Sequence, residues 1–165
     1  MRSWWSPLAS RLAVVREVQR RGDSALFVRS FGFALTTPIL MFVSLPRLDA
    51  LLDWLVARAT PPSAADPDAI ARTVLQMLEV GPPLVPRGCK TRGLTLYYCL
   101  RRAGIDVELC FGMGRAPGGD GFDGHCWVTL NGAPFCEKRD PAQHYVTMYT
   151  FRGGARENAA ELARA

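Results

Sequence analysis

Three residues in the second half of the chain carry the groups that covalent amide chemistry requires: a thiol, an imidazole and a carboxylate. Cys89 follows the turn-forming Pro86-Arg87-Gly88 and begins a predicted helix. His125 begins a predicted strand, and Glu137 lies on the next strand, beyond Asn131-Gly132. A thiol that is activated by a neighbouring imidazole attacks a carbonyl carbon and forms an acyl-thioester. The three residue types, in this order, therefore predict a cysteine nucleophile with its base and acid.

Each of the three positions suits a different role in that reaction. The N-terminus of a helix lowers the pKa of a thiol through unpaired amides and the positive end of the helix dipole, which favours Cys89 as the nucleophile. The same amides can stabilise an oxyanion on an acyl group bound to the sulfur. His125 could accept the thiol proton and return it to the leaving amine. An acid on the adjacent strand, Glu137, would hold the imidazole in the required tautomer.

The turn between the two strands decides whether His125 and Glu137 can meet. Asn-Gly is the strongest short hairpin signal, but a strict two-residue loop at Asn131-Gly132 would place the two side chains on opposite faces of the sheet. We therefore expect a three-residue loop or a bulge, which would bring them to one face. Asp140 is the alternative candidate for the orienting acid.

The elements that must position these residues follow from the periodicity of the apolar residues. Helical spacing continues to residue 103, and from residue 105 the apolar residues alternate with polar ones, as in a strand. The segment around 115–123 is either a lid over the cleft or a long connection. The expected elements are a helix over 91–103, a strand over 105–111, a glycine-rich loop over 112–124, hairpin strands over 126–130 and 133–137, and a strand over 145–151.

The first half of the chain is predicted to be helical. Helical spacing is present over 10–21, over 48–59 and in the helix that begins at Asp66-Pro67. The apolar stretch 25–45 is interpreted as two buried or interfacial helices broken near Pro38, with a membrane span as the minor alternative. The expected division is a helical N-terminal region over 1–59, a linker over 60–67, a catalytic core over 68–151 and a C-terminal tail over 152–165.

Composition limits the class of protein. A chain of 165 residues, 48% of them hydrophobic, is long enough for one domain with a buried core. Five cysteines, an odd number, and an apolar run that begins too late for a signal peptide favour a reducing compartment over a secreted disulfide scaffold. Neither of the two histidines has the spacing of a zinc site, so we expect no metal. We expect no cofactor either, and a requirement for a nucleotide stays open. Helices followed by antiparallel strands predict an α+β fold.

The positive charge of the chain is concentrated near its N-terminus. The formal net charge is +5, and residues 1–30 hold six arginines against two acidic residues. A solvated helix face is the simplest interpretation, while contact with a protein partner or with a membrane surface through residues 1–45 stays open. We expect no nucleic-acid partner.

At the candidate site the sequence resembles a known family. The matching motifs are Cys89-Lys-Thr-Arg92-Gly-Leu94, the run Tyr98-Cys-Leu-Arg-Arg-Ala-Gly-Ile-Asp-Val-Glu-Leu109, and Gly124-His-Cys-Trp-Val128 before Asn131-Gly132. They resemble the transglutaminase-like cysteine peptidases of lasso-peptide biosynthesis, the B proteins, which remove the leader from a ribosomally made precursor. The likeness covers roughly residues 68–150 and implies a transglutaminase-like (papain-like) fold with Cys89 as nucleophile, His125 as base and Glu137 as orienting acid.

The resemblance also implies a cellular setting. The longer B proteins carry a small leader-recognition domain before the peptidase, and residues 1–59 show no strand alternation that would fit one. A split form of the B protein would rely on a separate recognition protein and act on the precursor peptide, in some cases beside the lasso cyclase. The implied enzyme is bacterial and cytoplasmic, and membrane association through the N-terminal region is open.

Two departures from the family pattern keep other interpretations in view. Lys90 stands where the family has Leu, and Glu137 stands where Asp is more usual. These departures motivate a non-catalytic module that binds a peptide or a partner protein. Transamidation or amide hydrolysis of a small molecule on the same fold is a third interpretation, because fold alone does not separate these activities.

Other candidate residues have structural and functional interpretations side by side. Trp127 shares a strand face with His125 and is either a core residue or a platform for substrate, and Arg92 is either a partner for a substrate carboxylate or a member of a structural ion pair. Four cysteines and one histidine are predicted to be packing residues: Cys99, Cys110, Cys126, Cys136 and His144.

Overall fold

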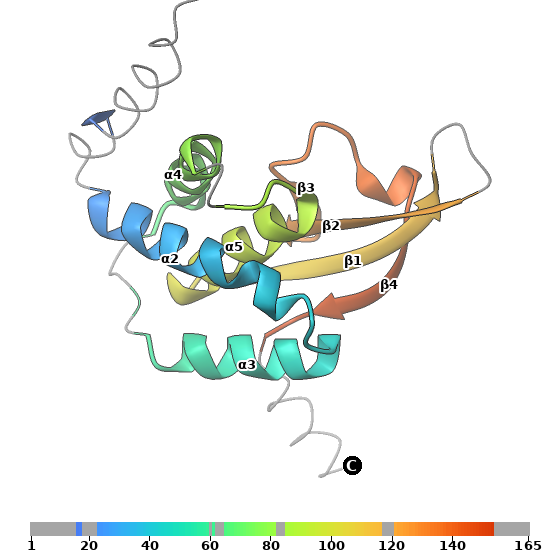
Figure 1. The fold of residues 1–165 in the computed structure, drawn as a ribbon, viewed down its shortest axis with the longest axis horizontal. Helices are drawn as coiled ribbons and strands as arrows, with labels where there is room; N and C mark the ends of the chain where they lie inside the picture. The colour runs from blue at the N-terminus through green and yellow to red at the C-terminus, as the bar shows by residue number, and fades with distance from the viewer. Residues whose placement is uncertain are drawn as a thin grey trace, which may run out of the picture.

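A long helix that begins at Cys89 joins the helical and the sheet portions of the molecule. The computed structural model describes residues 16–17, 23–59, 61, 65–81, 85–116 and 121–153. Figure 1 shows the helices of the first half and the antiparallel sheet of the second. The elements are α2 (Ser24–Leu40), α3 (Leu45–Ala57), α4 (Pro67–Val80), α5 (Cys89–Arg102), β1 (Val107–Arg115), β2 (Phe122–Leu130), β3 (Ala133–Phe135), the 3-10 helix η1 (Pro141–Gln143) and β4 (Val146–Phe151).

The described elements confirm the predicted α+β class. The helix predicted over 91–103 is α5, which begins two residues earlier, and the helix after Asp66-Pro67 is α4, whose first turn Asp66 caps by accepting from the Asp68 amide at 3.0 Å. The helix predicted over 10–21 lies outside the described residues except for 16–17. The tail after residue 153 and residues 117–120 of the predicted lid also lie outside them.

The break predicted near Pro38 lies a few residues later, between α2 and α3, and Pro38 itself does not interrupt α2. Pro38 lies inside the last turn of α2, which continues to Leu40, and the chain turns over residues 41–44 before α3. Proline has no amide hydrogen to offer the carbonyl four residues earlier, here Ala34. The Thr37 hydroxyl donates to that carbonyl at 2.7 Å. The helix therefore tolerates the proline, because a side chain replaces the missing hydrogen bond.

One hydrophobic core unites the helices with the sheet. α5 is buried along most of its length and contacts α2, α3 and α4 on one side and strands β1 and β2 on the other. Phe33 of α2 stacks on Tyr98 of α5, with ring centroids 4.2 Å apart. The same cluster includes Leu52 of α3, Val74 of α4 and Phe151 of β4. The helices before residue 60 thus share the core of the predicted catalytic segment.

The sheet is longer than the glycine content of 112–124 suggests. Its strand order is β3-β2-β1-β4, all neighbours antiparallel, and β1 and β2 pair from Val107 with Leu130 to Arg115 with Phe122. The predicted loop over 112–124 is therefore wrong at both of its ends, since residues 112–115 belong to β1 and residues 122–124 to β2. A Cβ at Gly114 would collide with the carbonyl oxygen of His144, so this glycine permits a close approach of two backbone segments within a strand.

The hairpin between β2 and β3 has a two-residue loop, so the expected three-residue loop is wrong. Leu130 pairs with Ala133, and Asn131 and Gly132 have φ values of 53° and 78°, as a type I′ turn requires. Pairing stops at Phe135, and Cys136 has a positive φ of 59°. The backbone thus changes direction after β3 rather than within the hairpin loop.

No helix among the described residues has the length and apolar content that a membrane crossing needs. α2, the helix within the apolar stretch 25–45, has 17 residues and includes Arg29 and Pro38. The membrane span considered for this stretch is thus not found in the described part of the chain.

Candidate active site

A cleft of about 1030 Å³ lies between α4, the start of α5, β2 and the segment that joins β3 to β4. Cys89, His125 and Glu137, the three residues predicted to act together, all line it. One wall is apolar and is formed by Leu75 and Leu78 of α4. The fold thus brings Cys89 to one cleft with His125 and Glu137, which lie 36 and 48 positions later in the sequence.

Cys89 is the first residue of α5 and is half-buried at the cleft. The first hydrogen bond of the helix runs from the Arg92 amide to the Gly88 carbonyl at 3.1 Å, so the amides of residues 89–91 have no partner within the helix. These amides and the positive end of the helix dipole can stabilise a negative charge on the sulfur or on the oxygen of a bound carbonyl. Lys90, which departs from the family pattern, is exposed and leaves the buried face of the helix undisturbed.

A glycine inside α5 allows the helix to lie close to the sheet. A Cβ at Gly93 would stand 2.7 Å from Sγ of Cys126 and 3.1 Å from a methyl carbon of Leu109. Any larger residue would push α5 away from β1 and β2. Gly93 therefore helps to set the distance between the Cys89 end of the helix and the strand that carries His125.

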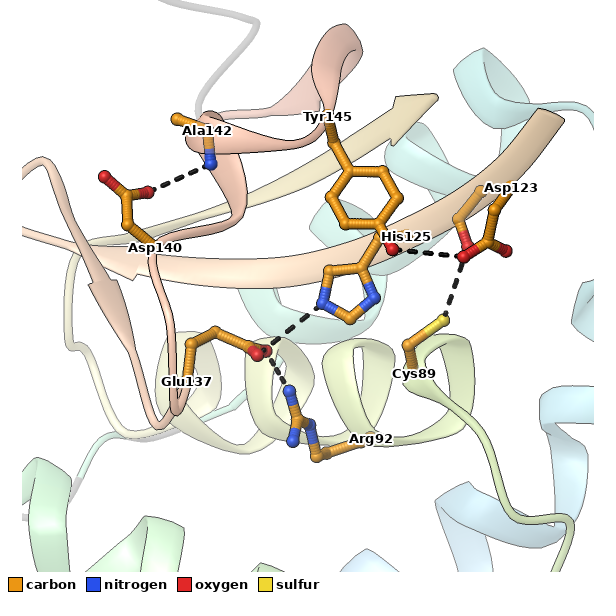
Figure 2. A network of polar contacts seen from close by, with 9 residues as sticks. Cys89, Arg92, Asp123, His125, Glu137, Asp140, Ala142 and Tyr145 are labelled. Atoms are coloured by element: carbon orange, nitrogen blue, oxygen red, sulfur yellow. Dashed lines mark hydrogen bonds and ion pairs between the residues drawn. The ribbon is translucent and has the colours of Figure 1, made fainter. Parts of the chain in front are cut away.

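His125 lies between the thiol and the carboxylate. Its Nε2 is 3.5 Å from Oε2 of Glu137. Figure 2 shows the imidazole between Glu137 and Cys89, with one ring nitrogen facing the carboxylate and the other on the side of the sulfur. Sγ of Cys89 donates to the carbonyl oxygen of Gly124, the residue before His125, at 3.9 Å. The thiol thus rests beside the backbone of its prospective base.

Glu137 reaches His125 because the chain turns at Cys136. A strict continuation of the hairpin would place the carboxylate on the other face of the sheet from His125. The positive φ of Cys136 ends the alternation and directs Glu137 to the imidazole. Asp140, the alternative acid, instead caps η1 by accepting from the Ala142 amide at 3.0 Å (Figure 2).

Arg92 forms an ion pair with Oε1 of Glu137. It lies three residues after Cys89 on α5 and lines the cleft, with its side chain 31% exposed against 11% for Glu137. The guanidinium and the imidazole therefore contact the two oxygens of one carboxylate. This contact agrees with the structural ion pair considered for Arg92. The Arg92 guanidinium is therefore already paired and is not available to bind a substrate carboxylate.

Burial and the charge of Arg92 lower the pKa of His125 below its ordinary value of 6.5, and Asp123 acts in the opposite direction. A lowered pKa favours the neutral imidazole at neutral pH. The neutral form can accept a proton, as a base for the Cys89 thiol must.

This pKa predicts the pH dependence of the reaction. Protonated His125 cannot accept the thiol proton, so kcat/KM is expected to fall as the pH falls through the pKa of His125, below 6.5. Arg92→Gln removes a positive charge that lowers this pKa, which moves the acid limb of the profile to higher pH. The measurement is kcat/KM against pH for both proteins. Arg72→Gln, an exposed change on α4 outside the cleft, is the control, and an acid limb that moves to lower pH in Arg92→Gln would contradict the assignment.

Two aromatic rings hold the imidazole in place. Trp127 lies 5.9 Å from His125 at an interplanar angle of 15°, and Tyr145 lies 5.0 Å away at 25°. The Tyr145 hydroxyl donates to Asp123 at 3.1 Å (Figure 2). Trp127 is 3% exposed and does not line the cleft, so it packs behind His125 instead of forming a platform for substrate. Sequence reasoning missed Tyr145, for which the only signal was its place at the start of the last predicted strand.

The remaining cysteines divide into two groups. Cys99, Cys110 and Cys126 are buried, which confirms the packing interpretation, and burial raises the pKa of each thiol. Cys136 is half-buried and packs against the hydrophobic core, as predicted, and it also lines the cleft. His144 is exposed at the edge of the cleft, so the prediction that it is a packing residue is wrong. Among the described residues, no group of three or more His, Cys, Asp or Glu side chains is placed to hold a metal ion.

Comparison with known proteins gives one match. The family model of the transglutaminase-like superfamily matches residues 33–150, more than two thirds of the chain. No curated protein and no solved structure matches the chain. The matched region begins within α2 and includes all three members of the candidate triad. The chain therefore belongs to the transglutaminase-like superfamily, which includes cysteine peptidases and acyltransferases.

Proposed function

We propose that this protein is a cysteine peptidase that removes the leader from a ribosomally synthesised lasso-peptide precursor. The observation that carries the enzymatic part of this proposal is the meeting of Cys89, His125 and Glu137 in one open cleft. The motif likeness of residues 89–94 and 124–128 to the lasso-peptide B proteins supports the choice of substrate.

The geometry supports a two-step reaction. His125 accepts the thiol proton of Cys89, and the sulfur attacks the carbonyl carbon of the scissile amide. The oxyanion faces the free amides at the start of α5. Collapse of the tetrahedral intermediate breaks the carbon–nitrogen bond, and His125 donates the proton to the departing amine. Water, deprotonated by His125, then hydrolyses the thioester, which releases the leader carboxylate and restores the thiol.

Glu137 and the aromatic rings support the imidazole through both steps. Oε2 of Glu137 lies 3.5 Å from Nε2, and its charge stabilises the positive charge that His125 carries after it takes the thiol proton. Trp127 and Tyr145 limit the orientations of the ring. A fixed imidazole gains rate because less orientational freedom is lost as the reaction proceeds.

The proposed partners are the precursor peptide and a separate leader-recognition protein in the bacterial cytoplasm. The cleft volume of about 1030 Å³ is large enough for several residues of an extended peptide. A separate recognition protein would raise the local concentration of the precursor at this cleft.

The test is a reconstituted cleavage reaction. Purified protein, precursor peptide and recognition protein are incubated together, and the leader fragment is measured by mass spectrometry. We expect release of one leader fragment with a free carboxylate. Precursor that binds but stays intact in the complete mixture would support the binding module instead, and a leader joined to an added amine would support an acyl transfer.

A further inference from the structure

The cleft carries three positive side chains that the proposed reaction does not use. Arg87 lies two residues before Cys89, and Lys138 and Arg139 follow Glu137 directly. All three are exposed and line the cleft. In the described part of the chain none of them has a carboxylate within ion-pair distance. We call these three residues the basic rim.

The negative charge in the cleft does not balance the basic rim. Two acidic residues line the cleft, and Glu137 is already engaged by Arg92 and His125. This leaves Glu79 of α4 against the three cations. A concave site with an excess of one charge raises the local concentration of ligands with the opposite charge.

The basic rim and the apolar wall lie around the same reacting groups. Leu75 and Leu78 stand one turn apart on α4 and are half-buried at the cleft. An extended peptide rises about 3.3 Å per residue, so side chains near its scissile bond come within reach of both features. Apolar and acidic side chains can therefore be bound by different parts of one cleft.

We propose that the cleft selects peptides with acidic side chains close to the scissile bond, bound by Arg87, Lys138 and Arg139, together with an apolar side chain against Leu75 and Leu78. The inference rests on the proposed function of the same site and names its substrate class. Interactions between exposed charges act mainly on the association rate and are screened by salt. The preference for acidic peptides is therefore expected as a lower KM, and most clearly at low ionic strength.

The experiment uses two sets of synthetic peptides that differ only in charge. Both carry a Leu and random uncharged positions, and one set has Glu where the other has Gln on each side of the centre. Cleavage by the wild-type protein and binding to Cys89→Ala are measured for both sets, the latter by fluorescence anisotropy. We expect the Glu set to bind about four- to twenty-five-fold more tightly at low salt, since each of its two Glu side chains forms an exposed ion pair that contributes a factor of about two to five.

Two variants separate the basic rim from general charge. In both, Cys89→Ala is the background for binding. The triple variant Arg87→Gln, Lys138→Gln, Arg139→Gln is expected to bring the ratio of the two affinities close to one. The control Arg47→Gln, Arg72→Gln, Arg115→Gln removes the same net charge at exposed positions outside the cleft and is expected to keep the ratio.

The outcomes distinguish this inference from the proposed function. Equal binding of the Glu and Gln sets to the Cys89→Ala protein would overturn the charge preference, as would a preference that the triple rim variant retains. Selective binding of the Glu set without cleavage of either set by the wild-type protein would support the preference and count against the peptidase.

Discussion

Replacing Cys89 with Ala is expected to reduce leader release by about 10⁴-fold or more, because the chain then lacks the atom that forms the acyl-thioester. The side chain is half-buried and its neighbours in α5 are held by the core, so the substitution should leave the fold intact. The measurement is the rate of leader release by mass spectrometry, with circular dichroism to confirm the helices.

Cys136→Ser is the matched control for that variant. Cys136 is also half-buried and lines the same cleft, but it lies after β3 and has no helix N-terminus behind it. The account predicts that this variant keeps most of the activity. Leader release by Cys89→Ala at a rate close to wild type would exclude Cys89 as the nucleophile.

Replacing His125 with Ala is expected to lower turnover nearly as far as replacing Cys89, because the thiol loses its base and the leaving amine its acid. Residues that act as one unit have non-additive effects. The double variant Cys89→Ala, His125→Ala should therefore be no slower than Cys89→Ala alone. The rates of the two single variants and the double variant are measured in the same leader-release assay.

His144→Ala is the control for the loss of an imidazole. His144 lies at the edge of the cleft, is exposed, and shows no contact with the candidate triad. We expect this variant to release the leader at a rate close to that of the wild-type protein. A larger loss of activity in His144→Ala than in His125→Ala would contradict the assignment of His125 as the base.

The helices that position the nucleophile could be predicted from the sequence because their signals are local. α5 follows from apolar residues at helical spacing, and α4 from Asp66-Pro67 at its start. Pro38 indicated the break between α2 and α3 only approximately, because the Thr37 hydroxyl satisfies the carbonyl that the proline leaves free and α2 continues to Leu40. Local sequence signals therefore predict where a helix lies, but they do not show where a neighbouring side chain compensates for a helix-breaking residue.

The extent of the sheet and the route to Glu137 depend on contacts distant in sequence. From sequence alone, Gly114 is predicted to lie in a loop. In the structure it lies in a strand, where the backbone of His144 leaves no room for a side chain. The Asn131-Gly132 signal for a two-residue loop was correct, and the requirement that Glu137 meet His125 led to the wrong loop length. The positive φ of Cys136, which has no clear sequence signal, reconciles the two.

The composition of the triad was predictable, whereas its surroundings were not. Cys89, His125 and Glu137 were found from residue type and spacing, and the structure brings them to one cleft. The contacts of Tyr145 with His125 and Asp123 arise only when the segment before β4 crosses β2. The basic rim was also missed, because its members are separated by about fifty residues and meet only at the cleft.

The alkylation rate of Cys89 tests the central claim most directly, because it requires neither precursor nor partner. The protein is treated with iodoacetamide near neutral pH, and modification of each cysteine is followed by peptide mass spectrometry. Cys136 is the internal reference, since it is also half-buried in the same cleft and burial raises the pKa of its thiol. The account predicts that Cys89 is modified well before Cys136 and that His125→Ala removes most of this difference. Modification of Cys89 no faster than Cys136, with no effect of His125→Ala, would contradict it.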